Sequence, residues 1–280
     1  MAFLNELQSK LLEAFSYLHD VCVANGLRYY ACGGTLLGAV RHHGFIPWDD
    51  DIDVWMPRPD YEKLKVIMRE KEAGGRYVFE APGANDGHHY YAMGKLYDTT
   101  TTLVEKQKHR IRKGIFIDIF PLDGLGNSTE ERDKRYKKMH LRNMMIASRI
   151  SVPRKERSTF KNMAIRVSSL LPESVLDTRK VIERFDLECK KIPYENSRYV
   201  GVLMGSLGMQ DVIEKEILQS TRLYDFETIQ IYGTTEYDRL LTYIYNDWRK
   251  LPPVEKRVTL HDFEELDLHH GYLDGEGKNA

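Results

Sequence analysis

Four aspartates lie close together near the start of the chain, at Asp49, Asp50, Asp51 and Asp53. Asp51 and Asp53 are two residues apart in an apolar-flanked segment that predicts a β-strand, so their side chains leave the same face and can share one divalent cation. Mg²⁺ prefers oxygen ligands and is usually bound by one or two carboxylates together with substrate phosphates. We therefore predict a metal site at Asp51 and Asp53, with Asp49 and Asp50 as either outer groups or solvated loop charges.

A glycine pair precedes these acids. Gly33 and Gly34 lead into Thr35–Arg41, which predicts a short helix whose free N-terminal amides would face a phosphate. A glycine pair alone more often marks a turn, and an acidic run more often a solvated loop. Here, however, the acids have the apolar neighbours Pro47, Trp48, Ile52, Val54 and Trp55, which indicate partial burial. Because buried carboxylates are costly without compensation, a metal ion is the natural partner.

A third acid lies further along the chain. Asp118 stands alone in the apolar stretch Ile115–Phe120, where a carboxylate is costly to bury unless it meets a cation. Asp123, in the sequence PLDG, is predicted to be a turn residue. Arg41, about two turns into the predicted helix, and Lys95, in the middle of a predicted strand, are candidates for direct phosphate contact. The alternative for each is a structural ion pair with one of the acids.

Two tryptophans flank the acidic segment, Trp48 and Trp55. Aromatic faces bind quaternary ammonium groups by cation–π attraction, so these rings could hold a cationic head group. The alternative is that they pack in the core.

Hydrophobic periodicity predicts an α+β fold, with a mixed β-sheet core flanked by helices and a helical insertion. We expect a catalytic core at 1–127, a helical, basic insertion at 128–198, a C-terminal part at 199–273 that packs back on the core, and a disordered tail at 274–280. The predicted helices are 3–21, 35–41, 58–71, 128–150, 173–192 and 235–247, and the predicted strands are 27–32, the Asp51–Asp53 segment, 76–80, 91–97, 101–105, 114–120 and 221–231.

Charge and cysteine content indicate which kinds of partner and which cellular compartment to expect. The net charge of −1 gives no general sign of nucleic-acid binding, so we expect no nucleic-acid partner. The three cysteines are widely spaced without a C-x-x-C motif, which favours a reducing cytoplasm over a disulfide framework. Between Arg132 and Arg166 the chain has twelve Lys and Arg residues against two acids. This segment is either a solvated helix face or a surface that attracts a phosphate-rich acceptor or an anionic membrane.

Three motifs carry a resemblance to a known family. They are ACGGTLLGAVRHHGFIPWDDDIDVWMPRPDYEKL (Ala31–Leu64), GIFIDIFPLDGL (Gly114–Leu125) and YNDWRKLPPVEKR (Tyr245–Arg257). In this order they resemble the LicD family, which belongs to the nucleotidyltransferase-fold superfamily, includes bacterial phosphorylcholine transferases and is distantly related to fukutin. The resemblance implies a nucleotidyltransferase-like core.

The resemblance also implies a mechanism. Asp51, Asp53 and Asp118 would be the catalytic acids and the ligands of Mg²⁺, or of Mn²⁺ in its place. The donor would be CDP-choline, and the acceptor a sugar hydroxyl of a cell-surface glycan, such as lipopolysaccharide or a teichoic acid precursor, either free or linked to lipid. A related enzyme could instead transfer ribitol phosphate, glycerol phosphate or a nucleotidyl group from the same metal site. We expect a cytoplasmic protein that can contact the inner face of the membrane.

Overall fold

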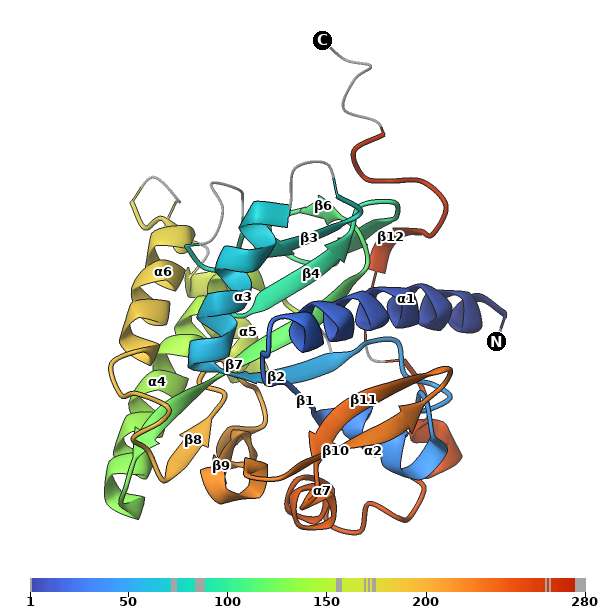
Figure 1. The fold of residues 1–280 in the computed structure, drawn as a ribbon. Helices are drawn as coiled ribbons and strands as arrows, with labels where there is room; N and C mark the ends of the chain where they lie inside the picture. Colours follow the sequence, from blue (N-terminus) through green and yellow to red (C-terminus); the bar gives the residue numbers. More distant parts are fainter. Residues whose placement is uncertain are drawn as a thin grey trace.

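The computed structural model describes residues 2–71, 75–83, 89–154, 158–168, 170, 172, 175–259, 261 and 263–274. These residues form one seven-stranded mixed sheet, two smaller sheets and seven α-helices (Figure 1). The predicted mixed sheet with flanking helices is confirmed. The detailed nucleotidyltransferase-like arrangement of the core stays a prediction.

The central sheet holds the segments that carry the predicted acids. Strands β2 and β7 lie side by side in parallel, and their other neighbours in the sheet are antiparallel. In spatial order the strands are β1 (Tyr30–Ala31), β2 (Asp53–Pro57), β7 (Phe116–Gly126), β4 (Gly94–Asp98) and β3 (Tyr77–Glu80), with β8 (Tyr199–Gly201) and β9 (Val212–Glu214) joined through the far end of β7.

The described residues form seven α-helices. They are α1 (Ala2–Ala24), α2 (Gly33–His42), α3 (Arg58–Lys71), α4 (Thr129–Ile150), α5 (Thr159–Ser168), α6 (Thr178–Cys189) and α7 (Tyr237–Tyr245). Of these, α1, α2, α3 and α4 pack against strands. Helix α1 buries Leu7, Leu11, Phe15 and Leu18, which recur at helical spacing and pack in the core, as predicted. In Figure 1, α1 and α3 cover one face of the central sheet. Among the described residues, no helix combines the length and the apolar composition that crossing a bilayer requires.

Two smaller sheets involve the C-terminal part of the chain. Strands β10 (Thr221–Phe226) and β11 (Ile229–Thr234) form an antiparallel hairpin. Strand β12 (Phe263–Asp267) pairs with β5 (Thr102–Glu105), which also pairs with β6 (Arg112–Lys113). Short 3₁₀ turns occur at Gly208–Asp211, Lys215–Leu218 and Val254–Lys256. The pairing of β12 with β5 returns the end of the chain to the predicted catalytic core.

Several predicted elements differ from the structure. Asp51 lies before β2 rather than in it, because the chain is still leaving a turn closed by the Asp49 N–H to Ile46 O hydrogen bond (2.9 Å). The single strand predicted at 221–231 is a hairpin, whose turn places Glu227 at a φ of 54°. Helix α6 begins only at Thr178, and the side chain of Asp177 caps it by accepting hydrogen bonds from Arg179 N–H and Lys180 N–H. Most of the predicted tail, 275–280, lies outside the described residues.

Asp123 is not the turn residue that we predicted. It lies within β7, where its carboxylate is buried and accepts hydrogen bonds from Arg58 Nε and Nη2, both at 2.7 Å. Asp186 accepts a further hydrogen bond from Arg58 at 2.8 Å. These contacts tie α3, β7 and α6 together at a distance from the acidic segment.

Candidate active site

Asp53 and Asp118 are neighbours across the two parallel strands. Asp53 starts β2 and is in register with Asp118 of β7, and Asp118 N–H donates to Ile52 O at 3.0 Å. The side chain of Thr35 fixes this strand end, because its Oγ1 accepts a hydrogen bond of 2.9 Å from Asp53 N–H. Burial raises the pKa of Asp53 well above its usual value, and the charges of Asp51 and Asp118 raise it further.

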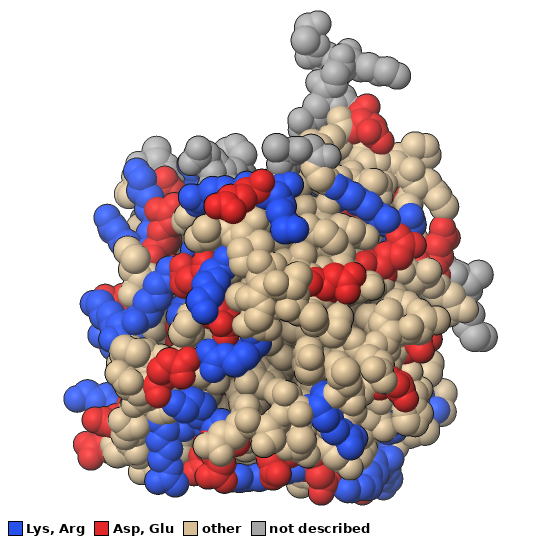
Figure 2. Space-filling model, in the orientation of Figure 1, with Lys and Arg blue, Asp and Glu red and all other residues tan. Residues whose placement is uncertain are grey.

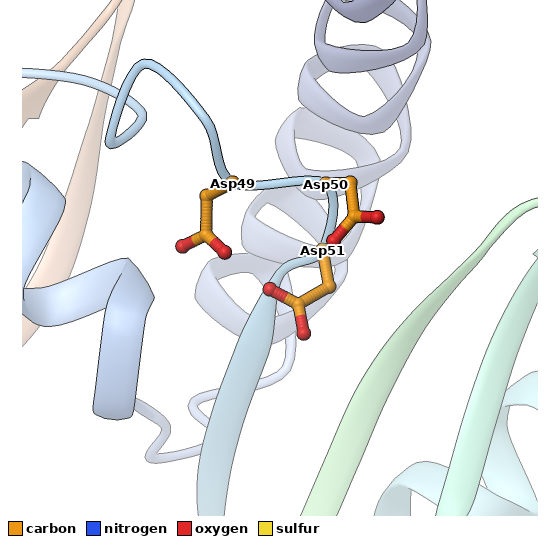
Figure 3. A group of neighbouring side chains, drawn as sticks. All are labelled: Asp49, Asp50 and Asp51. Carbon is orange, nitrogen blue, oxygen red and sulfur yellow. The ribbon is translucent and has the colours of Figure 1, made fainter. Parts of the chain in front are cut away.

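Three more carboxylates lie in the loop that leads into β2 (Figure 3). Asp49, Asp50 and Asp51 can each place one oxygen within 4.8 Å of the others. The pKa of Asp49 is raised to about 8, first by burial and then by the charges of Asp51 and Asp50. Burial also raises the pKa of Asp51. Asp49 and Asp50 are therefore not solvated loop charges, since Asp49 is half-buried and Asp50 is buried.

The start of α2 lies against these acids. Gly33 has a φ of 52°, a left-handed conformation that side chains rarely adopt. A methyl group on Gly34 would come within 2.5 Å of Asp49 Oδ2, and one on Gly33 would lie 3.8 Å from Asp53 Oδ2. The missing side chains thus allow the carboxylates to approach the first turn of the helix. The predicted helix is confirmed, with its first turn beside the acidic cluster of Asp49, Asp51, Asp53 and Asp118, which we call the acid cluster.

Lys95 enters the site from β4. Its Nζ lies 2.8 Å from Asp118 Oδ1 and 3.9 Å from Glu105 Oε2, and it is 3.2 Å from the centre of the Phe116 ring. The residue is only 2% exposed. The ion pair that we considered as the alternative is therefore present, and phosphate contact by Lys95 stays a prediction. Burial raises the pKa of Asp118, while the charge of Lys95 opposes that increase.

Arg41 lies near the C-terminal motif. Its Nη1 donates to Trp248 O at 2.7 Å and its Nε to His42 Nε2 at 3.0 Å. Burial lowers the pKa of Arg41, and the neighbouring Tyr245 opposes this effect. Burial raises the pKa of Tyr245, as do the nearby Cys32 and the acids of the cluster. A methyl group on Gly33 would lie 3.7 Å from Tyr245 Oη and 3.8 Å from Asp53 Oδ2, so Tyr245 reaches the start of α2 beside the acids. We did not predict a role for it, although the third motif begins at this residue.

The two tryptophans lie in different surroundings. Trp55 is 5% exposed and part of the hydrophobic core, in register with Tyr30 of β1. Trp48 is half-buried, and the Cζ atom of Arg257 lies 5.4 Å from the centre of its ring. Trp55 therefore occupies the core position that we considered as the alternative. Head-group recognition by Trp48 stays a prediction.

His261 is a residue of this site that the sequence did not reveal. Its Nδ1 donates to Asp50 Oδ1 at 2.9 Å, and its Nε2 lies 3.8 Å from Asp51 Oδ2. The hydrogen bond to Asp50 raises the pKa of His261 to about 9, against the opposing effect of burial. His261 lies close to the start of β12, so the pairing of β12 with β5 brings it here. No local pattern around His261 indicates this contact.

The residues present fit a divalent cation. The donors are carboxylate oxygens, the type that Mg²⁺ prefers, and the buried Asp50 Oδ2 has no hydrogen-bond partner among the described residues. The pKa values of Asp49, Asp51, Asp53 and Asp118 are also raised, which means that nearby positive charge does not fully offset the cost of burying these negative charges. The assignment of Asp51, Asp53 and Asp118 as ligands stays a prediction, and Asp49 and Asp50 are the carboxylates whose oxygens lie close enough to Asp51 to share an ion with it.

Residues 26–167, about half of the chain, match the family described as "LicD/FKTN/FKRP, nucleotidyltransferase domain". The chain belongs to the LicD family. The matched range includes the α2 glycines and the acid cluster, whereas Tyr245 and His261 lie beyond it.

Individual relatives agree with this membership. The LicD-family chain is 29% identical over 263 residues to the lipopolysaccharide cholinephosphotransferase LicD of Haemophilus influenzae, covering 92% of this chain and 96% of that protein. It is also 42% identical over 64 residues to the ribitol 5-phosphate transferase FKRP of human and of mouse, covering 23% of this chain and 13% of theirs. The resemblance to LicD and to the fukutin-related proteins is confirmed.

Proposed function

We propose that this protein transfers a phosphate-containing group onto a glycan, and specifically that it moves phosphocholine from CDP-choline to a sugar hydroxyl. The observation that carries this proposal is the acid cluster at the start of α2, where Asp49 lies against Gly34 and Asp53 is in register with Asp118. The similarity to a lipopolysaccharide cholinephosphotransferase extends over 92% of the chain and supports the choice of phosphocholine. A lipopolysaccharide or a teichoic acid precursor is the proposed acceptor.

Asp49, Asp51, Asp53 and Asp118 would hold the metal ion. When bound, Mg²⁺ neutralises charge on the donor phosphates, and it also compensates the carboxylates that raise one another's pKa. Phosphoryl-type transfer depends mainly on positioning and charge stabilisation, so the site needs no side-chain nucleophile.

The chain's own groups position the donor. The N-terminal amides of α2, at Gly33, Gly34 and Thr35, belong to the helix turn beside the acid cluster and would donate to phosphate oxygens. Arg41 lies at the other end of α2, in its last turn, where its Nη1 donates to Trp248 O, and its contact with a donor phosphate stays a prediction. The acceptor oxygen forms a bond to the phosphorus that carries choline, the bond from that phosphorus to the bridging oxygen breaks, and CMP leaves. An ionised carboxylate of the cluster accepts the proton of the acceptor hydroxyl.

Transfer of ribitol phosphate is the second candidate. The 42% identity to ribitol 5-phosphate transferases over 64 residues supports it. A further observation is that the Arg257 guanidinium lies over the Trp48 ring, so that ring already has a cation beside it. A ribitol head group carries no cation and does not need a free aromatic face.

A panel of donors tests the proposal. The protein is incubated with CDP-choline, CDP-ribitol or CDP-glycerol, with Mg²⁺ or with a chelator, and CMP release is measured with and without acceptor glycan. We expect acceptor-dependent release from CDP-choline that the chelator abolishes, and no release by the Asp53→Asn variant. Release from CDP-ribitol alone would replace the first candidate by the second. No release from any donor, by a protein that binds Mg²⁺, would contradict both.

A further inference from the structure

Helix α5 exposes a row of large apolar side chains. Phe160 is 79% exposed, Val167 is 58% exposed, and Met163 between them is also exposed. At 3.6 residues per turn these three residues form one stripe, which we call the α5 stripe. Ile165, on the opposite side of the helix, is buried. The helix therefore packs against the protein with the side that carries Ile165 and exposes the α5 stripe to solvent.

Basic residues flank the stripe. Lys161 and Arg166 are exposed and lie on opposite sides of it around the helix. The surrounding segment, from Arg132 to Arg166, has twelve Lys and Arg residues and two acids. An apolar stripe with Lys or Arg on both flanks is the pattern of helices that lie in the interface of an anionic membrane.

The exposed apolar surface continues onto α4. Leu141, Met144 and Met145 are exposed at helical spacing, and Lys137 and Lys138 lie one turn earlier on the same side. The two helices meet next to these residues, since Ser168 Oγ of α5 donates to Ser148 O of α4 at 2.8 Å. Figure 2 shows many Lys and Arg, with Asp and Glu between them, along the side of the molecule that α4 and α6 form.

We propose that the α5 stripe and the adjoining face of α4 dock on an anionic phospholipid surface. The apolar side chains would enter the interface while the flanking Lys and Arg contact lipid phosphates. Charge complementarity favours this occupant over a second copy of the chain, because two such faces would bring their excess positive charge together. The docking itself does not depend on the activity proposed above.

The position of this surface suits a lipid-linked acceptor, an inference that does rest on the proposed function. Ile150 O, at the end of α4, accepts a hydrogen bond of 2.8 Å from Lys108 N–H. Lys108 is three residues from Glu105, which lies 3.9 Å from Lys95 in the site. A short stretch of chain therefore joins the docking surface to the residues around Asp118.

Co-sedimentation with vesicles tests the docking. We compare phosphatidylcholine vesicles with vesicles that contain about one third phosphatidylglycerol. We expect binding to the anionic vesicles that weakens as salt is added, and about tenfold weaker binding by Val167→Asp. Val66→Asp on α3 is the matched control, because Val66 is also a helical valine that is 58% exposed, and it should bind like the unchanged protein.

A fluorescent label supplies a second measurement that does not depend on a destabilising charge. Cys22, Cys32 and Cys189 are all buried, so a cysteine at an exposed position is the accessible thiol. An environment-sensitive dye on Phe160→Cys should shift to shorter wavelength with anionic vesicles, whereas the same dye on Val66→Cys should not.

Three results would overturn the proposal: no binding of the unchanged protein to anionic vesicles, equal loss of binding in both aspartate variants, or no difference between the two labelled positions. A dye shift at position 160 that depends on protein concentration without vesicles would instead identify a self-association surface. CMP release from soluble acceptor glycan is measured in parallel. If Val167→Asp loses vesicle binding but still releases CMP, the docking surface and the catalytic site are tested independently of each other.

Discussion

Asp53 lies opposite Asp118 in the register of β2 and β7, and Lys95 Nζ lies 2.8 Å from Asp118. Burial raises the pKa of both carboxylates, but the charges around them differ. Asp118 has a buried cation as its immediate partner, whereas the charges of Asp51 and Asp118 act against ionisation of Asp53.

The first prediction is that Asp53→Asn and Asp118→Asn both abolish transfer but change stability in opposite directions. Without metal, Asp53→Asn should raise the melting temperature, because it removes repulsion. Asp118→Asn should lower stability by on the order of 3 kcal/mol, because it removes the nearest counter-charge of the buried Lys95 and leaves only Glu105, 3.9 Å away. Thermal melts in the presence of a chelator measure both. A rise in melting temperature for both variants would show that the Lys95 ion pair contributes little.

The second prediction concerns pH and metal. The pKa of Asp49 is raised to about 8 in the folded protein, so the folded state binds more protons than the unfolded state between about pH 4 and about pH 8. Stability without metal should therefore fall as pH rises through that window. Mg²⁺ displaces these protons, so its stabilising effect should be larger at about pH 8 than at about pH 6. Melting curves with and without Mg²⁺ at both pH values check this.

Titration calorimetry in two buffers of different ionisation enthalpy measures how many protons the protein releases when Mg²⁺ binds. We expect proton release when Mg²⁺ binds, and less release from Asp53→Asn. A Mg²⁺ effect on melting that is the same at both pH values, with no proton release, would contradict binding at the acid cluster.

The third prediction is that Gly34→Ala weakens Mg²⁺ binding while the fold persists. The new methyl group would come within 2.5 Å of Asp49 Oδ2, and the carboxylate is the part that can move away. We expect Mg²⁺ affinity to fall by about tenfold, the lower end of losses seen when groups that orient metal ligands are changed. Gly75→Ala is the control, because its nearest neighbour, Lys71 O, would be 3.5 Å away. Equal Mg²⁺ affinities of both variants would place Asp49 outside the site.

The fourth prediction separates the two tryptophans. Trp48→Leu should reduce affinity for CDP-choline by about 0.5 to 2 kcal/mol, and reduce it less for an analogue with a neutral tert-butyl group. Trp55→Leu should mainly reduce stability, because Trp55 packs in the core. Titration calorimetry and melting curves distinguish these effects. Equal losses for both ligands in Trp48→Leu would favour ribitol phosphate as the transferred group.

Local patterns account for the parts of the site that could be predicted. The glycine pair Gly33–Gly34 predicted the start of α2, and the run of apolar residues around Asp118 predicted β7. Both signals are contained in a few adjacent residues, so neither needs knowledge of the fold.

The remaining contacts depend on pairings between distant segments. The apolar stretch around Asp118 indicated that a cation was needed, but the register of β4 against β7 decides that Lys95 supplies it. Likewise, PLDG reads as a turn locally, and Asp123 becomes a strand residue because Arg58 and β8 meet it there. Strand register is set by tertiary packing, so a single sequence does not specify these partners.

The hydrogen bond between His261 and Asp50 joins residues that are 211 positions apart in the chain. During synthesis, the acidic loop and α2 leave the ribosome long before β12 does. The nascent protein therefore carries the loop without its histidine partner until residue 261 has left the ribosome. Premature termination after Asp118 but before His261 would release a chain that contains every predicted acid and lacks the histidine that pairs with Asp50.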